Sequence, residues 1–174
     1  ATNKFSVKFW GTRGSIASPG EKTVRYGGNT PCVQVKLPEG KLIILDGGTG
    51  IRELGNELIE KGKEPVEGHI LLSHYHWDHI QGLPFFVPAY QAQNKFSIWG
   101  PGHPQVSLEK IISDQMESVY FPIKLSYMSA KINFKILNEL EDNRLGHGSV
   151  KAFRVNHPGI TFGYKIAYQD KNVV

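Results

Sequence analysis

The segment from Ser73 to His79 concentrates the side chains of this sequence that could do metal chemistry. Its ligand-type members are His74, His76, Asp78 and His79. Imidazole and carboxylate groups are common ligands of divalent ions in proteins. Because side chains two positions apart on an extended backbone point the same way, His74 and His76 can share one ion. Asp78 and His79 come where the chain must bend, and they can reach a second ion about 3.5–4 Å from the first.

The surroundings of this cluster support a site rather than a chance grouping. A single histidine is more often a surface residue or a hydrogen-bonded core residue than a ligand. Four ligand-type side chains within positions 74–79 have few structural uses, so together they favour a metal site. The cluster also follows residues 69–72, an apolar run that predicts a short buried strand. Ligand sites of α/β proteins lie at the ends of such strands.

Short apolar or alternating runs predict the other strands, and apolar residues at helical spacing predict helices. The strands are expected at 5–9, 32–37, 41–45, 96–99, 132–136, 150–155 and 162–168, with another opening at 173. The helices are expected at about 51–62 and 105–119. Several polar candidates follow the ends of these strands.

Asp46 ends the strand expected at 41–45, and glycines follow it that let the backbone approach closely. A carboxylate there suggests a residue that hydrogen-bonds a metal ligand, although it could instead cap the next helix. His157 repeats the order of strand, histidine and turn, and is the candidate for a third imidazole on the first ion. Arg13 lies in a glycine-flanked turn, where it could hold a phosphate or stand solvated.

Other reactive or aromatic residues receive structural interpretations. His103 and His147 accompany glycine-containing turns, and both are expected to be solvated rather than ligands. The aromatic segment 85–90 could line a pocket beside the metal site, but such side chains are more often core. Cys32 is the only cysteine in the sequence, so an internal disulfide is excluded. It is expected to pack as a small buried apolar side chain. Ser73 is expected to be structural.

The length and composition of the sequence predict a single globular domain. The 174 residues are 40% hydrophobic and 21% charged, without a long apolar run or the apolar core of a signal peptide. The net charge of +4 comes from scattered basic residues, which slightly favours an anionic substrate. A nucleic-acid partner is not favoured, because it would require clustered charge. With a single cysteine, these features predict a cytoplasmic protein without a membrane partner.

The motif His74-x-His76-x-Asp78-His79 resembles that of the metallo-β-lactamase fold superfamily. The segments Leu45-Asp46-Gly47-Gly48 before it and Asn156-His157-Pro158 after it extend the likeness over nearly the whole chain. The segments 11–15 and 26–30 resemble the phosphodiesterase branch, which includes ribonuclease Z and cyclic phosphodiesterases. The resemblance implies an α/β (α+β) fold class: an αββα sandwich of two similar halves.

The resemblance also implies two divalent metal ions, zinc by default, with manganese or iron compatible. The ligands of one ion would be His74, His76 and His157, and those of the other would include Asp78 and His79. Asp46 matches an aspartate that hydrogen-bonds a ligating histidine. Trp77 stands where ribonuclease Z commonly has glycine, and with Arg13 it is a candidate for substrate binding.

Two elements of the family pattern do not occur in this sequence. The pattern needs an aspartate that bridges both ions, just after the strand that begins near Val173, and a late histidine on the second ion. We therefore expect residues 1–174 to be a single domain truncated at its C-terminus, comprising the first half of the sandwich and the start of the second. Such a half would expose an apolar sheet face, so we expect a homodimer or pairing with the missing half.

The expected function of the intact parent is that of a metal-dependent phosphodiesterase acting on a cyclic nucleotide or another phosphodiester. A hydroxide bridging the ions would attack phosphorus, with Asp78 orienting it as well as binding metal. Two alternatives remain open: a thioesterase or other acyl hydrolase of the same fold, and a truncated binding module without activity. A flavo-diiron oxidoreductase is disfavoured because it carries a carboxylate where His76 stands.

Overall fold

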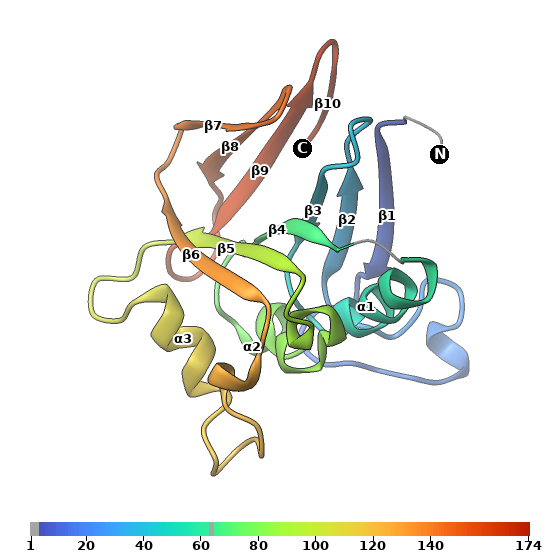
Figure 1. The fold of residues 1–174 in the computed structure, drawn as a ribbon, viewed down its shortest axis with the longest axis vertical. Helices are drawn as coiled ribbons and strands as arrows, with labels where there is room; N and C mark the ends of the chain where they lie inside the picture. Colours follow the sequence, from blue (N-terminus) through green and yellow to red (C-terminus); the bar gives the residue numbers. More distant parts are fainter. Residues whose placement is uncertain (1–3, 63–64) are drawn as a thin grey trace.

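Two β-sheets form the framework of the computed structural model, which describes residues 4–62 and 65–174 (Figure 1). The first sheet has the strand order β1-β2-β3-β4-β5-β6, and the second has the order β10-β9-β8-β7. The strands of the first sheet are β1 Ser6–Gly11, β2 Cys32–Lys36, β3 Leu42–Leu45, β4 Glu67–Leu71, β5 Lys95–Pro101 and β6 Lys131–Leu137. Those of the second are β7 Asp142–Leu145, β8 Gly148–Arg154, β9 Phe162–Tyr168 and β10 Lys171–Val173.

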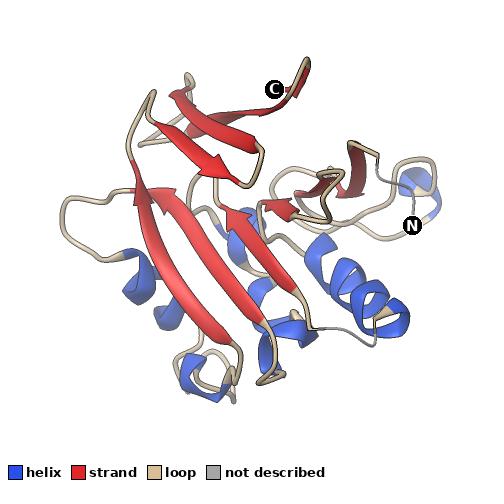
Figure 2. Cartoon of the chain, turned by 45° about the horizontal axis from the view of Figure 1, so that its top comes forward, coloured by secondary structure: helices blue, strands red, loops and turns tan. Residues whose placement is uncertain are grey.

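The helices lie on one side of the six-stranded sheet, away from the second sheet (Figure 2). They are α1 Gly50–Lys61, α2 Trp77–Ile80 and α3 Leu108–Asp114, with short 3-10 turns η1 Glu21–Thr23, η2 Leu83–Phe85, η3 Val87–Tyr90 and η4 Leu125–Tyr127. Among the described residues, none of the helices has the length and apolar character that crossing a bilayer requires.

The expected helix at 51–62 is confirmed, but the one expected over 105–119 is wrong in extent. It begins only at Leu108, because the Ser107 hydroxyl caps it by accepting a hydrogen bond from the Lys110 backbone N–H at 3.2 Å. It ends at Asp114, and Val119, whose spacing suggested a core-facing position, is 85% exposed.

The register of the parallel strands decides where the chemistry lies. Strands β3, β4, β5 and β6 run parallel, and Leu45, Leu71 and Trp99 stand side by side near the ends of the first three. The segments that follow these strands therefore emerge at one edge of the sheet. Carboxyl ends of parallel strands are the usual location of ligand sites in such sheets.

Two apolar cores hold the layers together. One lies between the helices and the first sheet and contains Phe86 and Phe96, whose rings pack edge to face at 5.0 Å. The other lies between the sheets, where Trp99 and Leu71 meet residues of β8 and β9. The order of layers is thus helix, sheet, sheet, which agrees with the first part of the predicted αββα sandwich.

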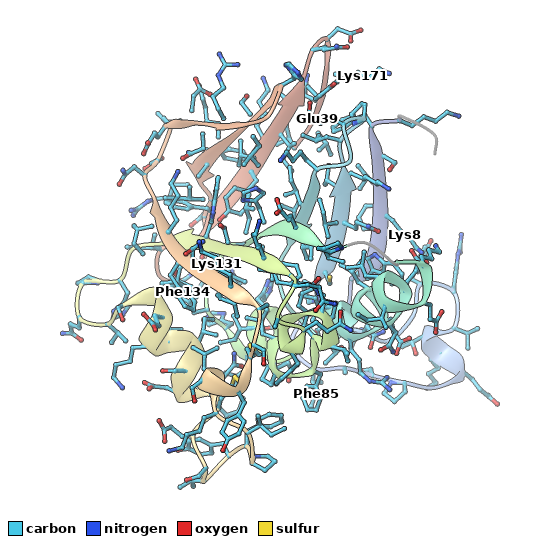
Figure 3. The ribbon with its side chains drawn as sticks, viewed as in Figure 1. Lys8, Glu39, Phe85, Lys131, Phe134 and Lys171 are labelled. Atoms are coloured by element: carbon cyan, nitrogen blue, oxygen red, sulfur yellow. The ribbon has the colours of Figure 1, made fainter. Side chains whose placement is uncertain are left out.

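The turns at the open end of the two sheets are also joined. The Glu39 carboxylate, in the turn between β2 and β3, accepts a hydrogen bond from the His147 backbone N–H at 3.0 Å (Figure 3). The His147 side chain is 83% exposed, as expected for a surface turn.

One apolar face of the first sheet is only partly covered by the described residues. On β1, Lys8 forms an ion pair with Glu57 of α1, so Val7 and Phe9 point to the opposite face. Phe9 is 66% exposed and Val7 38% exposed. Pairing of this face with a second copy or with a further half-domain stays a prediction.

Candidate metal centre

The structure brings three imidazoles together at the carboxyl edge of the first sheet. The ligand atoms of His74, His76 and His157 all lie within 4.8 Å of one another. His76 Nδ1 is 3.0 Å from His74 Nε2 and 3.4 Å from His157 Nε2. The nitrogens around a tetrahedral zinc ion, at bonds of about 2.0–2.1 Å, stand about 3.3–3.4 Å apart. Two of the three nitrogen–nitrogen distances are thus close to those around one such ion, and the third is within 4.8 Å.

His157 reaches this cluster from the second sheet because two hydrogen bonds fasten β9 to the end of β4. The Phe162 backbone N–H donates to the Ser73 carbonyl at 2.9 Å. The buried Tyr164 hydroxyl donates to the Leu72 carbonyl at 2.6 Å. These bonds place the turn before β9 against the histidine segment. The contact between sheets is therefore what completes the three-imidazole cluster.

Asp46 and Ser73 fix the orientation of two of the histidines. One Asp46 oxygen accepts the Ser73 backbone N–H at 2.7 Å, while the other accepts His79 Nδ1–H at 2.8 Å and the Ser73 hydroxyl at 3.0 Å. The Ser73 oxygen also lies 3.0 Å from His74 Nδ1. Because the Ser73 hydroxyl donates its hydrogen to Asp46, its oxygen is left to accept a hydrogen bond from His74 Nδ1–H. Both rings then keep the Nε2 lone pair for a metal.

The protonation of these rings follows from burial and neighbouring charge. The pKa of His74 is lowered to about 4, first by burial and then by the neighbouring histidines. Burial also lowers the pKa of His79, but the hydrogen bond to Asp46 and the charges of Asp46 and Asp78 outweigh it, so its pKa is raised overall. His74 is therefore a neutral imidazole at neutral pH, which is the form that binds metal ions.

Asp78 and His79, the residues predicted to bind a second ion, lie side by side next to the three-imidazole cluster. Asp78 Oδ2 is 3.5 Å from His79 Nε2, and the His74 and His79 rings are 4.2 Å apart between centroids. The Ser15 backbone N–H also donates to Asp78 Oδ2 at 2.8 Å, which holds the carboxylate in place. Ser15 adopts a left-handed conformation with φ of 71° to make this contact. The loop after β1 is thus part of the site.

The two predicted substrate-binding residues lie at the edge of this site. Arg13 is exposed in the loop after β1, two positions before Ser15. Trp77 is 79% exposed at the start of α2, directly after His76. Ser73, expected to be structural, links Asp46 to His74 through its hydroxyl. Cys32 is fully buried, as expected.

His103 is a residue whose position the sequence reasoning missed. It remains exposed, as expected, but it lines a cavity of about 450 Å³ together with His74 and His76. The Gln105 backbone N–H donates to His103 Nδ1 at 3.2 Å, so the neutral ring carries its proton on Nε2. The available signal was its place after β5, because β5 ends at the same sheet edge as β3 and β4.

Comparison with known proteins agrees with this geometry. A family model described as the metallo-beta-lactamase superfamily matches residues 25–95, which include four of the five predicted ligands. Residues 25–95 are therefore similar in sequence to the metallo-β-lactamase superfamily. The chain's resemblance to the ribonuclease Z-like branch is also supported. Ribonuclease Z of Methanococcus maripaludis is 28% identical over 141 residues, which are 78% of this chain and 42% of that protein. Ribonuclease Z of Pyrococcus horikoshii is 26% identical over 169 residues, which are 95% of this chain and 48% of that protein.

Solved structures share the metallo-β-lactamase fold. Human tRNase Z, short form, aligns with a TM-score of 0.64 and 21% identity, over 95% of this chain and 66% of that one. The metallo-beta-lactamase fold protein YhfI from Bacillus subtilis aligns with a TM-score of 0.64 and 16% identity, over 95% of this chain and 58% of that one. The chain spans between 34% and 49% of the length of the curated relatives it matches.

Proposed function

We propose that this chain is a member of the metallo-β-lactamase superfamily and contributes the metal centre of a phosphodiester hydrolase. The observation that carries the proposal is the three-imidazole cluster, whose nitrogens stand 3.0 and 3.4 Å from His76 Nδ1 at the wall of an open cavity. Asp78 and His79 supply a second set of ligands beside it. These groups would hold divalent ions, zinc by preference, and such ions would supply polarisation of phosphoryl oxygens and activation of water for hydrolysis.

The protein's own residues prepare this site in two ways. Asp46 and Ser73 keep His74 and His79 in the tautomers that expose Nε2. The Ser15 N–H occupies one side of the Asp78 carboxylate and so fixes its direction. Donors that are already oriented lower the reorganisation needed when a charged substrate reacts.

His103 favours a phosphoryl substrate over an acyl one. Because Nδ1 accepts a hydrogen bond from the Gln105 backbone N–H, Nε2 of the neutral ring carries the proton and is a donor. A fixed donor in the wall of the cavity suits the non-bridging oxygens of a phosphodiester, which carry negative charge. The net charge of +4 and the ribonuclease Z relatives point in the same direction.

The test measures metal content and hydrolysis on the same preparation. After loading with zinc or manganese, we expect bound metal and hydrolysis of bis(p-nitrophenyl) phosphate, with little activity on a thioester. His76→Ala and His157→Ala should lose both properties, whereas His147→Ala, at an exposed turn away from the cluster, should keep them. Activity on the thioester alone would indicate an acyl hydrolase. Absence of bound metal would indicate a binding module.

A further inference from the structure

A second hollow of about 540 Å³ lies next to the histidine cavity, between α2 and the segment 106–121. Aromatic rings supply much of its lining: Trp77, Phe85, Tyr120 and Phe121, which we call the aromatic groove. Tyr75 lines both the aromatic groove and the histidine cavity, so the two spaces are neighbours. None of the roles assigned above uses this groove as a whole.

The rings of the aromatic groove are held open to solvent. Trp77 is 79% exposed, Tyr120 78% and Phe85 51%. Phe85 packs edge to face against Phe121 at 5.3 Å, which steadies one wall (Figure 3 shows Phe85 at the outer surface near α2). Several large exposed aromatic side chains gathered around one hollow mark a binding surface. Planar rings that are free on one face suit another planar ring.

Polar groups in the same lining add hydrogen-bonding capacity. The Gln115 side-chain nitrogen is buried and has no hydrogen-bond partner among the described residues. Asp114 and Gln81 also line the groove. A buried donor without a partner is unfavourable, and it calls for a ligand or water to satisfy it. Amide and carboxylate groups beside aromatic faces match the polar edge and flat face of a nucleobase.

We propose that the aromatic groove stacks the nucleobase of a nucleotide whose phosphate lies at the three-imidazole cluster. This inference rests on the proposed function, and it names the substrate class of that site. The two subsites are adjacent because Tyr75 lines both hollows, and because Trp77 of the groove directly follows His76 of the cluster. A purely apolar partner would leave the Gln115 donor unsatisfied, whereas a base can accept its hydrogen bond.

The decisive measurement compares the binding of two ligands to the metal-loaded protein by calorimetry. We expect 5′-AMP to bind about tenfold more tightly than ribose 5-phosphate, because stacking of one base on an aromatic side chain is commonly of that size. Tyr120→Ala and Trp77→Ala should abolish the preference, and Trp77→Phe should retain it. Tyr127→Ala is the matched control, since Tyr127 is 68% exposed but lies outside the groove lining.

Equal binding of the two ligands, or a preference that survives both alanine variants, would overturn the inference. A groove that instead joins two copies of the chain would show itself in sedimentation, because Tyr120→Ala would then shift a dimer toward monomer without changing the ligand preference. Hydrolysis of bis(p-nitrophenyl) phosphate is followed in parallel. If the protein hydrolyses this substrate but shows no preference for 5′-AMP, only the proposal that the aromatic groove binds a nucleobase is rejected. If the wild-type protein neither binds metal nor hydrolyses the substrate, the proposed function itself is rejected.

Discussion

Replacing Asp46 by asparagine tests whether this carboxylate sets the protonation of the histidines. Its side chain is 12% exposed and accepts hydrogen bonds from the Ser73 backbone N–H, the Ser73 hydroxyl and His79 Nδ1. Its backbone is left-handed, with φ of 62°, a conformation that asparagine tolerates as well as aspartate does. The substitution therefore removes the negative charge and replaces an acceptor oxygen with a donor amide group, while the shape of the side chain and the backbone conformation are retained.

The expected magnitude follows from those hydrogen bonds. Asparagine can still accept the Ser73 N–H with its carbonyl oxygen, but its amide group then faces His79 Nδ1 as a donor. His79 must move its proton to Nε2, the nitrogen that faces Asp78. The hydrogen bonds that this oxygen accepts from His79 and from the Ser73 hydroxyl are both lost, and each charge-assisted bond contributes about 1.5–3 kcal/mol to the free energy of unfolding. A ligand held in the wrong tautomer should weaken metal binding by about 10–100-fold.

The two quantities are measured separately. Urea unfolding in the presence of a chelator gives the stability of the metal-free protein, and competition with a fluorescent chelator gives zinc affinity. Asp142→Asn is the matched control: this carboxylate is 63% exposed and pairs with Lys151 at 3.3 Å, so its removal should cost at most about 1 kcal/mol. Zinc affinity within twofold of wild type would refute the tautomer argument, even if stability fell.

Three further outcomes are expected. His103→Ala should weaken the binding of inorganic phosphate to the metal-loaded protein about tenfold, as measured by calorimetry, because a charge-assisted hydrogen bond is lost. Gly48→Ala should lower the free energy of unfolding by about 1–3 kcal/mol in urea titrations, because its new Cβ would overlap the backbone oxygens of Asp78 and Pro31. Cys32 should resist a thiol reagent at mildly alkaline pH until the protein unfolds, because burial raises its pKa above the ordinary value of 9.0. Since the folded protein then holds the thiol proton more tightly than the unfolded chain does, stability should also fall as the pH rises above that ordinary value.

A specific result would contradict each of these three expectations. Undiminished phosphate binding by His103→Ala would mean that the ring does not reach the anion. Gly14→Ala is the control for Gly48→Ala, because a Cβ at Gly14 meets nothing within 4 Å. An equal decrease in the free energy of unfolding of the two variants would contradict the steric explanation. Labelling of Cys32 in the native protein, at the rate seen in urea, would show that the region around β2 opens readily.

The sequence by itself determined the local parts of the site. His74 and His76 are two positions apart on extended backbone, so their shared direction follows from strand geometry alone. Ile51 and Leu54, spaced for one helix face, likewise lie fully buried on α1. The extent of α3 was not predictable in the same way, because a capping hydrogen bond and the packing of the following segment override apolar spacing.

Only the tertiary structure decided which distant residues meet. Asp46 lies beside Ser73 because β3 and β4 pair in one particular parallel register, and His103 lines the cavity because β5 continues that register. His157 approaches His76 across 81 positions, through contacts between two sheets. Spacing rules describe neighbours along one element, whereas strand register and sheet packing depend on contacts throughout the core. The ligand motif is therefore readable in the sequence, while the completed metal centre and the aromatic groove beside it arise from the fold.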